Sequence, residues 1–207
     1  LGAGVLHPRA VEFAKNYLMP LEVRSSMELE NGTIIEEEVS MEKNLIVRGI
    51  AFEDQVTRVT VCGLPNELQT LSKIFTTLAQ NGLNVDIIIQ STTNDNSTSI
   101  SFSVKTADLE ETIHVLENNR EELKFTEIQH ESGLAKVSIV GSGMISNPGV
   151  AAEMFEVLAN HEIQVKMVST SEIKVSTVVE QVNMVKAVDA LHEAFNLSVA
   201  EQTEVTI

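Results

Sequence analysis

The chain carries one succession of hydrophobic and polar positions twice. Each copy starts with an apolar strand, continues through a turn into an amphipathic helix, and ends in a second apolar strand. The copies span 59–91 and 137–171, and they match at apolar or small positions: Phe75, Leu78, Ala79, Val85 and Ser91 in the first, and Phe155, Leu158, Ala159, Val165 and Ser171 in the second. A duplicated small module, rather than one large domain, is therefore the predicted unit of the fold.

The first copy extends into a complete βαββαβ module. Its first helix carries apolar residues at helical spacing: Leu68, Leu71, Phe75 and Leu78. Downstream, the pattern predicts an apolar strand at 85–89, an alternating strand around 100–104, a second helix at 108–119 and a closing strand near 124–129. This order predicts an α+β, ferredoxin-like fold, in which a four-stranded antiparallel sheet carries both helices on one face.

The second copy lacks a final strand of its own. Its pattern predicts strands at 136–140, 164–169 and 173–179, and helices at 149–160 and 184–195. The tail after it is a poor core strand, whereas the apolar segment 44–52 precedes the first copy and has no helix, so we expect that segment to complete the second sheet.

The first module is then inserted into the second. We expect the inserted module at 56–130 and the second module at 39–55 and 131–207, after a polar linker near 36–43. Residues 1–38 differ from the rest and predict a separate αβ segment.

Composition narrows the classes of partner. The 207 residues carry a formal net charge of -16, which disfavours nucleic acid and anionic membrane surfaces. No apolar run reaches the roughly 20 residues of a membrane-spanning helix. The single cysteine, Cys62, lies in an apolar strand, reads as a small buried hydrophobe and fits a reducing compartment. We expect a cytoplasmic protein, and we expect the chain, which opens on Leu1, to be part of a longer one.

A glycine-rich turn, GSGMISNPG at 141–149, follows a strand and opens a helix. It does not match a dinucleotide loop, because Ser146 stands where that fingerprint has its third glycine, and it lacks the Gly-Lys-Ser/Thr ending of a P-loop. Free backbone N–H groups at the helix start can still hold a ligand carboxylate. The turn is equally compatible with a purely structural start, with Asn147 as the cap and Pro148 as the first helical residue.

The strand opposite this turn ends in polar residues. Ser171 and Glu172 close it, and the equivalent strand of the first copy carries Asp86 and Gln90 where the second has Lys166 and Thr170. Polar residues of this kind are also typical of a solvent-facing strand surface. The five histidines show no metal-ligand spacing and Cys62 has no evident catalytic partner, so the sequence predicts no catalytic and no metal site.

The duplicated modules resemble tandem ACT domains, and nearly the whole chain is similar to the C-terminal regulatory part of bacterial lysine-sensitive aspartokinases. The resemblance rests on segments in a fixed order: GAGVLHPRAVEFA, PLEVRSS, RGIAF, KVSIVGSGM, NPGVAAEMF, VSTSEIKVS and ALHEAF. It implies that residues 1–38 are the end of an amino-acid kinase domain. It also implies that the catalytic site, with its ATP and Mg²⁺, lies outside this chain, which itself needs no cofactor.

The resemblance further implies an effector amino acid bound at the interface of a homodimer formed by ACT modules, next to a catalytic subunit or domain. The effector residues carried over by position are Asn66, Asp86 and Gln90 in the first module, and Met144, Ser146, Asn147, Pro148, Gly149, Val150, Ala151, Gln164, Val165, Ser171 and Glu172 in the second. Backbone N–H groups of 147–150, with Ser171, are expected to bind the carboxylate, and Glu172 and Asp86 the ammonium groups.

The identity of the effector depends on the first loop. That loop reads Asn66, Glu67, Leu68, Gln69 where the family usually has Asp-x-Pro-Gly, and a missing glycine weakens close approach of the backbone. Lysine is therefore favoured over threonine, although Lys166 stands where some lysine-sensing members have an aspartate. A threonine-responsive sensor and a structural dimerisation module without effector binding remain the alternatives.

Overall fold

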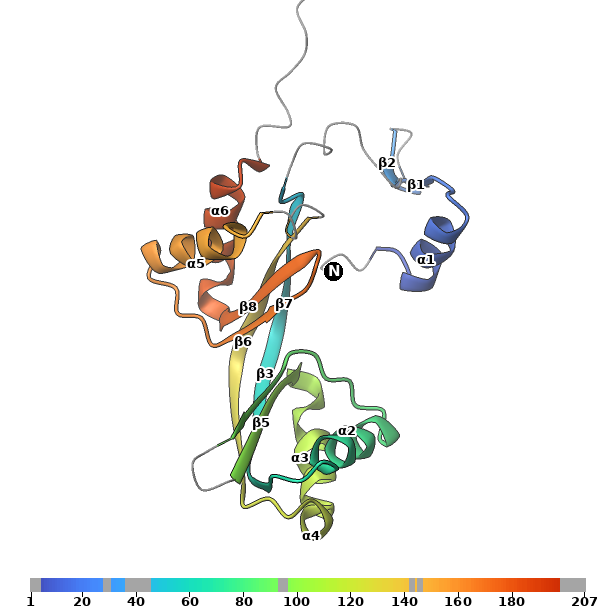
Figure 1. The fold of residues 1–207 in the computed structure, drawn as a ribbon. Helices are drawn as coiled ribbons and strands as arrows, with labels where there is room; N and C mark the ends of the chain where they lie inside the picture. The colour runs from blue at the N-terminus through green and yellow to red at the C-terminus, as the bar shows by residue number, and fades with distance from the viewer. Residues whose placement is uncertain are drawn as a thin grey trace, which may run out of the picture.

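One antiparallel six-stranded sheet, in the order β4-β5-β3-β6-β8-β7, runs through both modules (Figure 1). The computed structural model describes residues 5–27, 31–35, 46–92, 97–141, 144 and 147–197. The predicted linker at 36–43 and the tail at 198–207 lie outside these residues. The predicted α+β fold of two ferredoxin-like modules is confirmed.

The two modules share their central strands. β3 (Gly49–Pro65) and β6 (Glu127–Val140) are continuous, although the sequence predicted two shorter strands in each place. One end of β3, Gly49–Glu53, pairs with Lys136–Val140, and its other end, Arg58–Cys62, pairs with Glu127–Glu131. Register shifts between these ends accommodate the polar residues that, in the sequence, suggested the end of one strand and the start of another. Each module therefore has four strands, of which two are common to both.

In the first module, α2 (Thr70–Gln80) and α3 (Leu109–Asn118) cover the sheet, with β4 (Ile88–Thr92) at the edge and β5 (Ser97–Lys105) inside it. A short helix, α4 (Arg120–Leu123), leads back into β6. The core contains the alternating residues expected on β5: Ile100, Phe102 and Val104. The start of the first helix differs from the prediction. Helix α2 begins at Thr70, and Leu68, which precedes the helix, is fully exposed.

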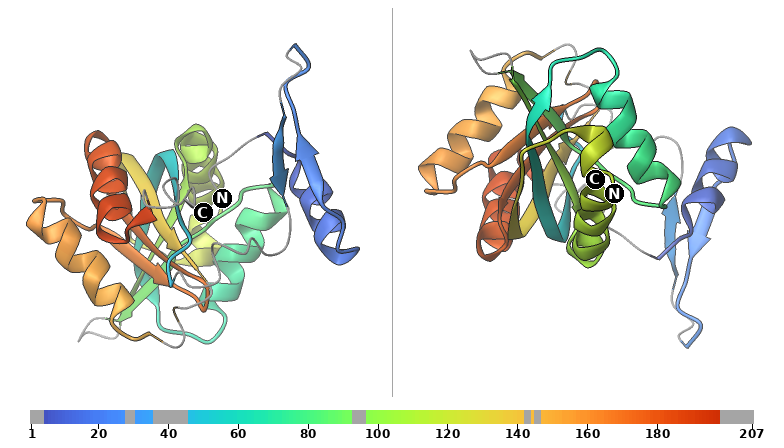
Figure 2. Two further views of the ribbon diagram at one scale, coloured as in Figure 1. Left: turned by 90° about the horizontal axis from the view of Figure 1, so that it is seen from above. Right: turned by 90° about the horizontal axis from the view of Figure 1, so that it is seen from below.

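The second module repeats this arrangement with α5 (Val150–Asn160), β7 (Met167–Thr170), β8 (Lys174–Glu180) and α6 (Met184–Ala194). Its core includes residues of both helices, among them Met154, Leu158 and Leu191. Single 3₁₀ turns, at Thr106–Asp108 and Gln181–Asn183, precede α3 and α6. In the views from above and from below, the helix pairs α2/α3 and α5/α6 lie on opposite sides of the molecule (Figure 2).

A third, smaller core lies where the modules meet. It contains Val56 and Ile87 from the first module, and Leu134, Met167 and Val178 from the second. Both edge strands begin later than predicted, at Ile88 and Met167, but the residues just before them still bond to the sheet. Asp86 N donates to Ser103 O, and Lys166 N donates to Val178 O. The segments that lead into β4 and β7 are therefore fixed at the junction.

The N-terminal αβ segment forms a sheet of its own. Helix α1 (Pro8–Asn16) is followed by β1 (Leu21–Val23) and β2 (Thr33–Ile35), which pair antiparallel with each other. Neither strand joins the six-stranded sheet (Figure 1). The predicted helix and strand of this segment are present.

Candidate functional site

The candidate loop of the first module leads into α2. Thr70 Oγ1 donates to Pro65 O at 2.7 Å and closes the loop, while Asn66 stays exposed on its outside. Gln69, the cap residue, makes no side-chain capping bond, so its side chain satisfies none of the first N–H groups of α2. The start of α2 can therefore bind an anionic group. The sequence predicted such a site only for the loop of the second module.

The candidate loop of the second module ends at α5, whose cap is Gly149 and whose first helical residue is Val150. The alternative interpretation, with Asn147 as cap and Pro148 as first helical residue, is therefore wrong by two residues. Instead, the backbone carbonyl of Asn147 accepts a hydrogen bond from Val150 N at 3.2 Å, which closes the turn. This bond occupies one of the N–H groups that were expected to bind the ligand. Because Gly149 has no side chain, the next N–H groups gain no side-chain cap.

The other residues of this loop take different positions. Met144 is half-buried against the second core, as is Ala151 in the first turn of α5. Pro148 and Gly149 are exposed. Ser146 lies outside the described residues.

The facing strand places its polar residues at the turn between β7 and β8. Ser171 N donates to Lys174 O at 2.8 Å, and Ser171 Oγ donates to the same carbonyl at 3.4 Å. Glu172 is exposed at the tip of this turn. At the other end of the strand, Gln164 is exposed and Val165 packs against the second core. The β7–β8 turn thus fixes the position of Ser171, and the Glu172 side chain is exposed to solvent.

Asp86, the candidate carboxylate of the first module, already binds a cation of the chain. Lys136 Nζ lies 2.5 Å from Asp86 Oδ2 and 2.6 Å from Glu53 Oε2. Burial opposes the charged form of Lys136, but hydrogen bonds to Asp86 and Glu53 outweigh it and raise the pKa of the ammonium above its usual range. Gln90 lies further along the same edge, in β4, and is exposed.

The second module holds the reverse charge at the equivalent place. Lys166 Nζ lies 3.1 Å from Glu131 Oε1 and 3.5 Å from Glu180 Oε1, and Glu131 also binds Arg58 at 2.7 Å. The hydrogen bond to Glu131 raises the pKa of Lys166. These ion pairs could not be predicted from the sequence, because the partners are far apart in the chain. The signal available in the sequence was a lysine, Lys136, within the mostly apolar run 134–140.

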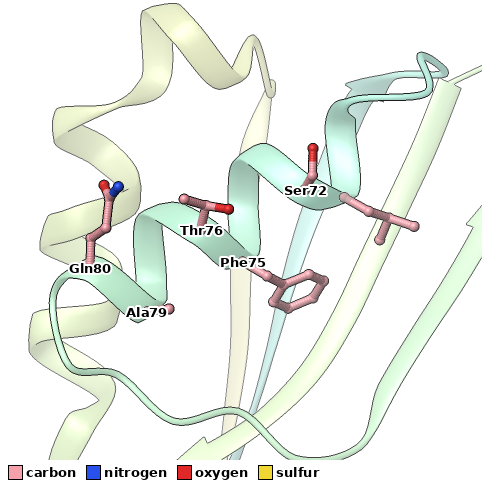
Figure 3. Close-up of a pocket in the computed structure, with 6 residues that line it drawn as sticks. Ser72, Phe75, Thr76, Ala79 and Gln80 are labelled. Atoms are coloured by element: carbon pink, nitrogen blue, oxygen red, sulfur yellow. The ribbon is translucent and has the colours of Figure 1, made fainter.

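Apolar surface borders both candidate loops. A shallow depression on the outside of α2 is lined by Leu71, Ser72, Phe75, Thr76, Ala79 and Gln80 (Figure 3). The ring of Phe75 meets Phe102 edge-on, with 5.8 Å between ring centroids, and so anchors the floor of the depression. The equivalent helix of the second module exposes Phe155.

Two classes of site are absent from the described part of the chain. It contains no group of three or more histidine, cysteine, aspartate and glutamate side chains placed to hold a metal ion. No helix in it is long and apolar enough to cross a membrane.

Comparisons with known proteins agree with this architecture. A family model described as ACT domain matches residues 59–119 and 137–195. The aspartokinase of Bacillus sp. (strain MGA3) is 74% identical over 198 residues, which cover 96% of this chain and 48% of that protein. The chain spans about half the length of the curated relatives it matches.

Solved structures give the same result. The ligand-free regulatory subunit of aspartate kinase from Thermus thermophilus is 32% identical with a TM-score of 0.68, over 72% of this chain and 99% of that one. Aspartokinase III of E. coli in complex with lysine and aspartate is 25% identical with a TM-score of 0.71, over 92% of this chain and 42% of that one. The family match covers both modules, and the relatives extend over nearly the whole chain. The chain therefore belongs to the ACT domain family, as a tandem ACT region of the aspartokinase type.

Proposed function

We propose that this chain binds lysine at an interface between ACT modules of two subunits, and that binding inhibits aspartate phosphorylation by the enzyme of which the chain is part. The observation that carries the proposal is the position of the candidate residues. Asp86 and Gln90 lie along the β4 edge of the sheet, and Ser171 and Glu172 lie at the end of the β7 edge. A site at a sheet edge is completed when a second chain covers that edge.

Exposed apolar side chains support assembly at these edges. Ile88 and Ile89 are 49% and 38% exposed on β4, and Leu71 is 37% exposed on the adjoining helix. On the other edge, Val168 and Phe155 are 36% and 37% exposed. Edge strands with unpaired backbone groups readily extend by pairing with another strand. A homodimer through the ACT modules would bury this surface and enclose the effector.

The ligand chemistry follows from charge. The uncapped starts of α2 and α5 are suited to the carboxylate of an amino acid. The carboxylates of Asp86 and Glu172 are suited to ammonium groups, and lysine offers two where threonine offers one. The lysine-bound E. coli aspartokinase III shows that a protein of similar fold is crystallised with this amino acid. Lysine is therefore the proposed effector, with threonine as the second candidate.

The catalytic part belongs to the proposal as well. We expect ATP and Mg²⁺ to be bound by a catalytic domain or subunit outside these residues, since the curated relatives are about twice as long. Inhibition then requires that lysine binds one arrangement of the modules better than another. The cytoplasm is the expected location.

Isothermal titration of the chain with lysine, threonine and both together tests the proposal, alongside sedimentation to follow assembly. Lysine-selective binding coupled to dimer formation is expected. Glu172→Ala should weaken lysine binding at least tenfold while the melting temperature without ligand stays unchanged, because Glu172 is exposed. A folded dimer that binds neither amino acid would instead favour a purely structural dimerisation module.

A further inference from the structure

Lys136 is a nearly buried cation at the centre of the molecule. It lies on β6 in a run of buried residues, Leu134–Ile139, and its side chain is 9% exposed, against 50% for Asp86 and 39% for Glu53. A buried ammonium requires close anionic partners. Both carboxylates reach it from the solvent side, at 2.5 and 2.6 Å.

This cation joins the two modules. Glu53 lies directly opposite Lys136 in the pairing of β3 with β6, within the second module. Asp86 comes from the first module, immediately before β4. The next residue, Ile87, is buried in the junction core together with Met167. A change at Asp86 therefore affects the ion pair with Lys136, the start of β4 and the junction core, which together connect the two modules.

Asp86 also carries the carboxylate that the proposed function assigns to the ammonium of the effector. Lys136 Nζ and a ligand ammonium are the same chemical group, so they bind the same oxygen atoms and repel each other at one carboxylate. Lys136 already holds Oδ2. An incoming ammonium must share Asp86 with Lys136 or displace it.

We propose that Lys136 is a positioning residue that competes with the effector ammonium for Asp86 and thereby lowers the affinity of the first module's site for the effector. Through Glu53, Lys136 also transmits the binding of the effector at this site to the second module. This inference rests on the proposed function. When the effector takes Asp86, Lys136 keeps only Glu53, so the link between the modules is weakened on the side where the ligand binds.

The second module supplies the contrast. Arg58 on β3 matches Lys136 on β6, since each stands one residue before the matched strand valines, Val59 and Val137. Arg58 and Lys166 share Glu131, so this junction is also closed by an ion cluster, but a cation, Lys166, stands at the position equivalent to Asp86. A cation at the position equivalent to Asp86 cannot bind an ammonium. Competition of this kind is therefore confined to the first module.

Isothermal titration with lysine tests the inference on four forms of the full chain: wild type, Lys136→Gln, Asp86→Asn and the double variant. Lys136→Gln removes the competing charge and keeps two hydrogen-bond donors, so lysine should bind at least fivefold more tightly. Asp86→Asn should bind lysine more weakly than wild type. In the Asp86→Asn background, Lys136→Gln should give no gain, because the carboxylate is gone.

Matched variants isolate the effect. Lys136→Arg keeps the charge and should bind lysine within twofold of wild type. Arg58→Met removes the equivalent cation at the junction, whose partner is Glu131, and should also leave the affinity within twofold. If Lys136→Gln does not fold, as judged by circular dichroism, Lys136→Met replaces it, and failure of both to fold overturns competition in favour of a structural role.

The outcomes separate the two proposals. A wild type that binds lysine and a Lys136→Gln variant with unchanged affinity would overturn the competition and leave the proposed function standing. A gain that persists with Asp86→Asn would also overturn it. A silent wild type with a Lys136→Gln variant that binds through Asp86 would support it. Silence in every form would overturn both.

Discussion

Ile87 and Met167 occupy equivalent positions in the two modules and are buried in the same small core. They are 3% and 2% exposed, and each stands one residue after a charged side chain of the junction, Asp86 or Lys166. The two edge strands that carry candidate effector residues therefore start from one shared cluster. Packing of this kind is sensitive to volume, so a shift of one strand is felt by the other.

Truncation of the shared core should destabilise the whole pair of modules. Met167→Ala removes a buried side chain and leaves a cavity, so we expect a loss of about 3 kcal/mol in the free energy of unfolding. The control is Val168→Ala, at the next position and 36% exposed, with an expected loss below about 1 kcal/mol. Urea unfolding followed by circular dichroism measures both. Equal losses would show that the junction core does not hold the modules together.

Gly63 is predicted to tolerate no side chain. Its φ is +70°, and a Cβ there would clash with the side chain of Thr126. Gly82 has nearly the same φ, +72°, but a Cβ there would meet nothing within 4 Å. Gly82→Ala should therefore cost about 1 kcal/mol from backbone strain alone, and Gly63→Ala at least about 2 kcal/mol. Thermal melts of the two variants compare them, and similar melting temperatures would mean that Thr126 moves aside.

The raised pKa of Lys136 predicts a loss of stability at alkaline pH. The folded state holds this proton more tightly than the unfolded chain, whose lysine titrates near 10.5. The stabilisation is therefore complete below about pH 10.5 and is lost as the pH rises through the higher pKa of the folded protein. The unfolding free energy of wild type should fall more steeply than that of Lys136→Gln above this pH. Parallel curves would mean that the ion cluster contributes nothing.

The apolar edge of the first module is predicted to drive assembly. Leu71→Glu places a charge in the depression on α2, so we expect dimerisation to weaken at least tenfold with little change in melting temperature. Val182→Glu is the matched control, because Val182 is 86% exposed outside this surface. Sedimentation velocity over a concentration series measures both. Equal dimerisation of the two variants would place the interface elsewhere.

The sequence predicted the local elements well because hydrophobic periodicity specifies them. The duplicated strand–helix–strand pattern and the alternation on β5 fall where the pattern places them, because one buried face selects those residues. The continuity of β3 could not be predicted in this way. Gln55 adopts a positive φ of 52°, and the polar residues around it read as a break, although the strand passes through as a bulge.

The chemistry of the candidate site was predictable only in part. Loop positions and the residues at the strand ends follow from the repeat and the family resemblance. The partner of Asp86 does not, since Lys136 lies 50 residues away and no local pattern joins them. Ion pairs between modules depend on the tertiary arrangement, which the sequence of either module alone does not contain. The interface that would complete the site depends further on a second chain.

Lysine binding by this chain is tested most directly by isothermal titration with lysine, and with threonine as the comparison, in a preparation whose assembly is followed by sedimentation. If the chain is a lysine sensor, lysine should bind at least tenfold more tightly than threonine, and binding should be accompanied by formation of the dimer. A folded protein that gives no heat with lysine, whatever its state of assembly, would contradict this function.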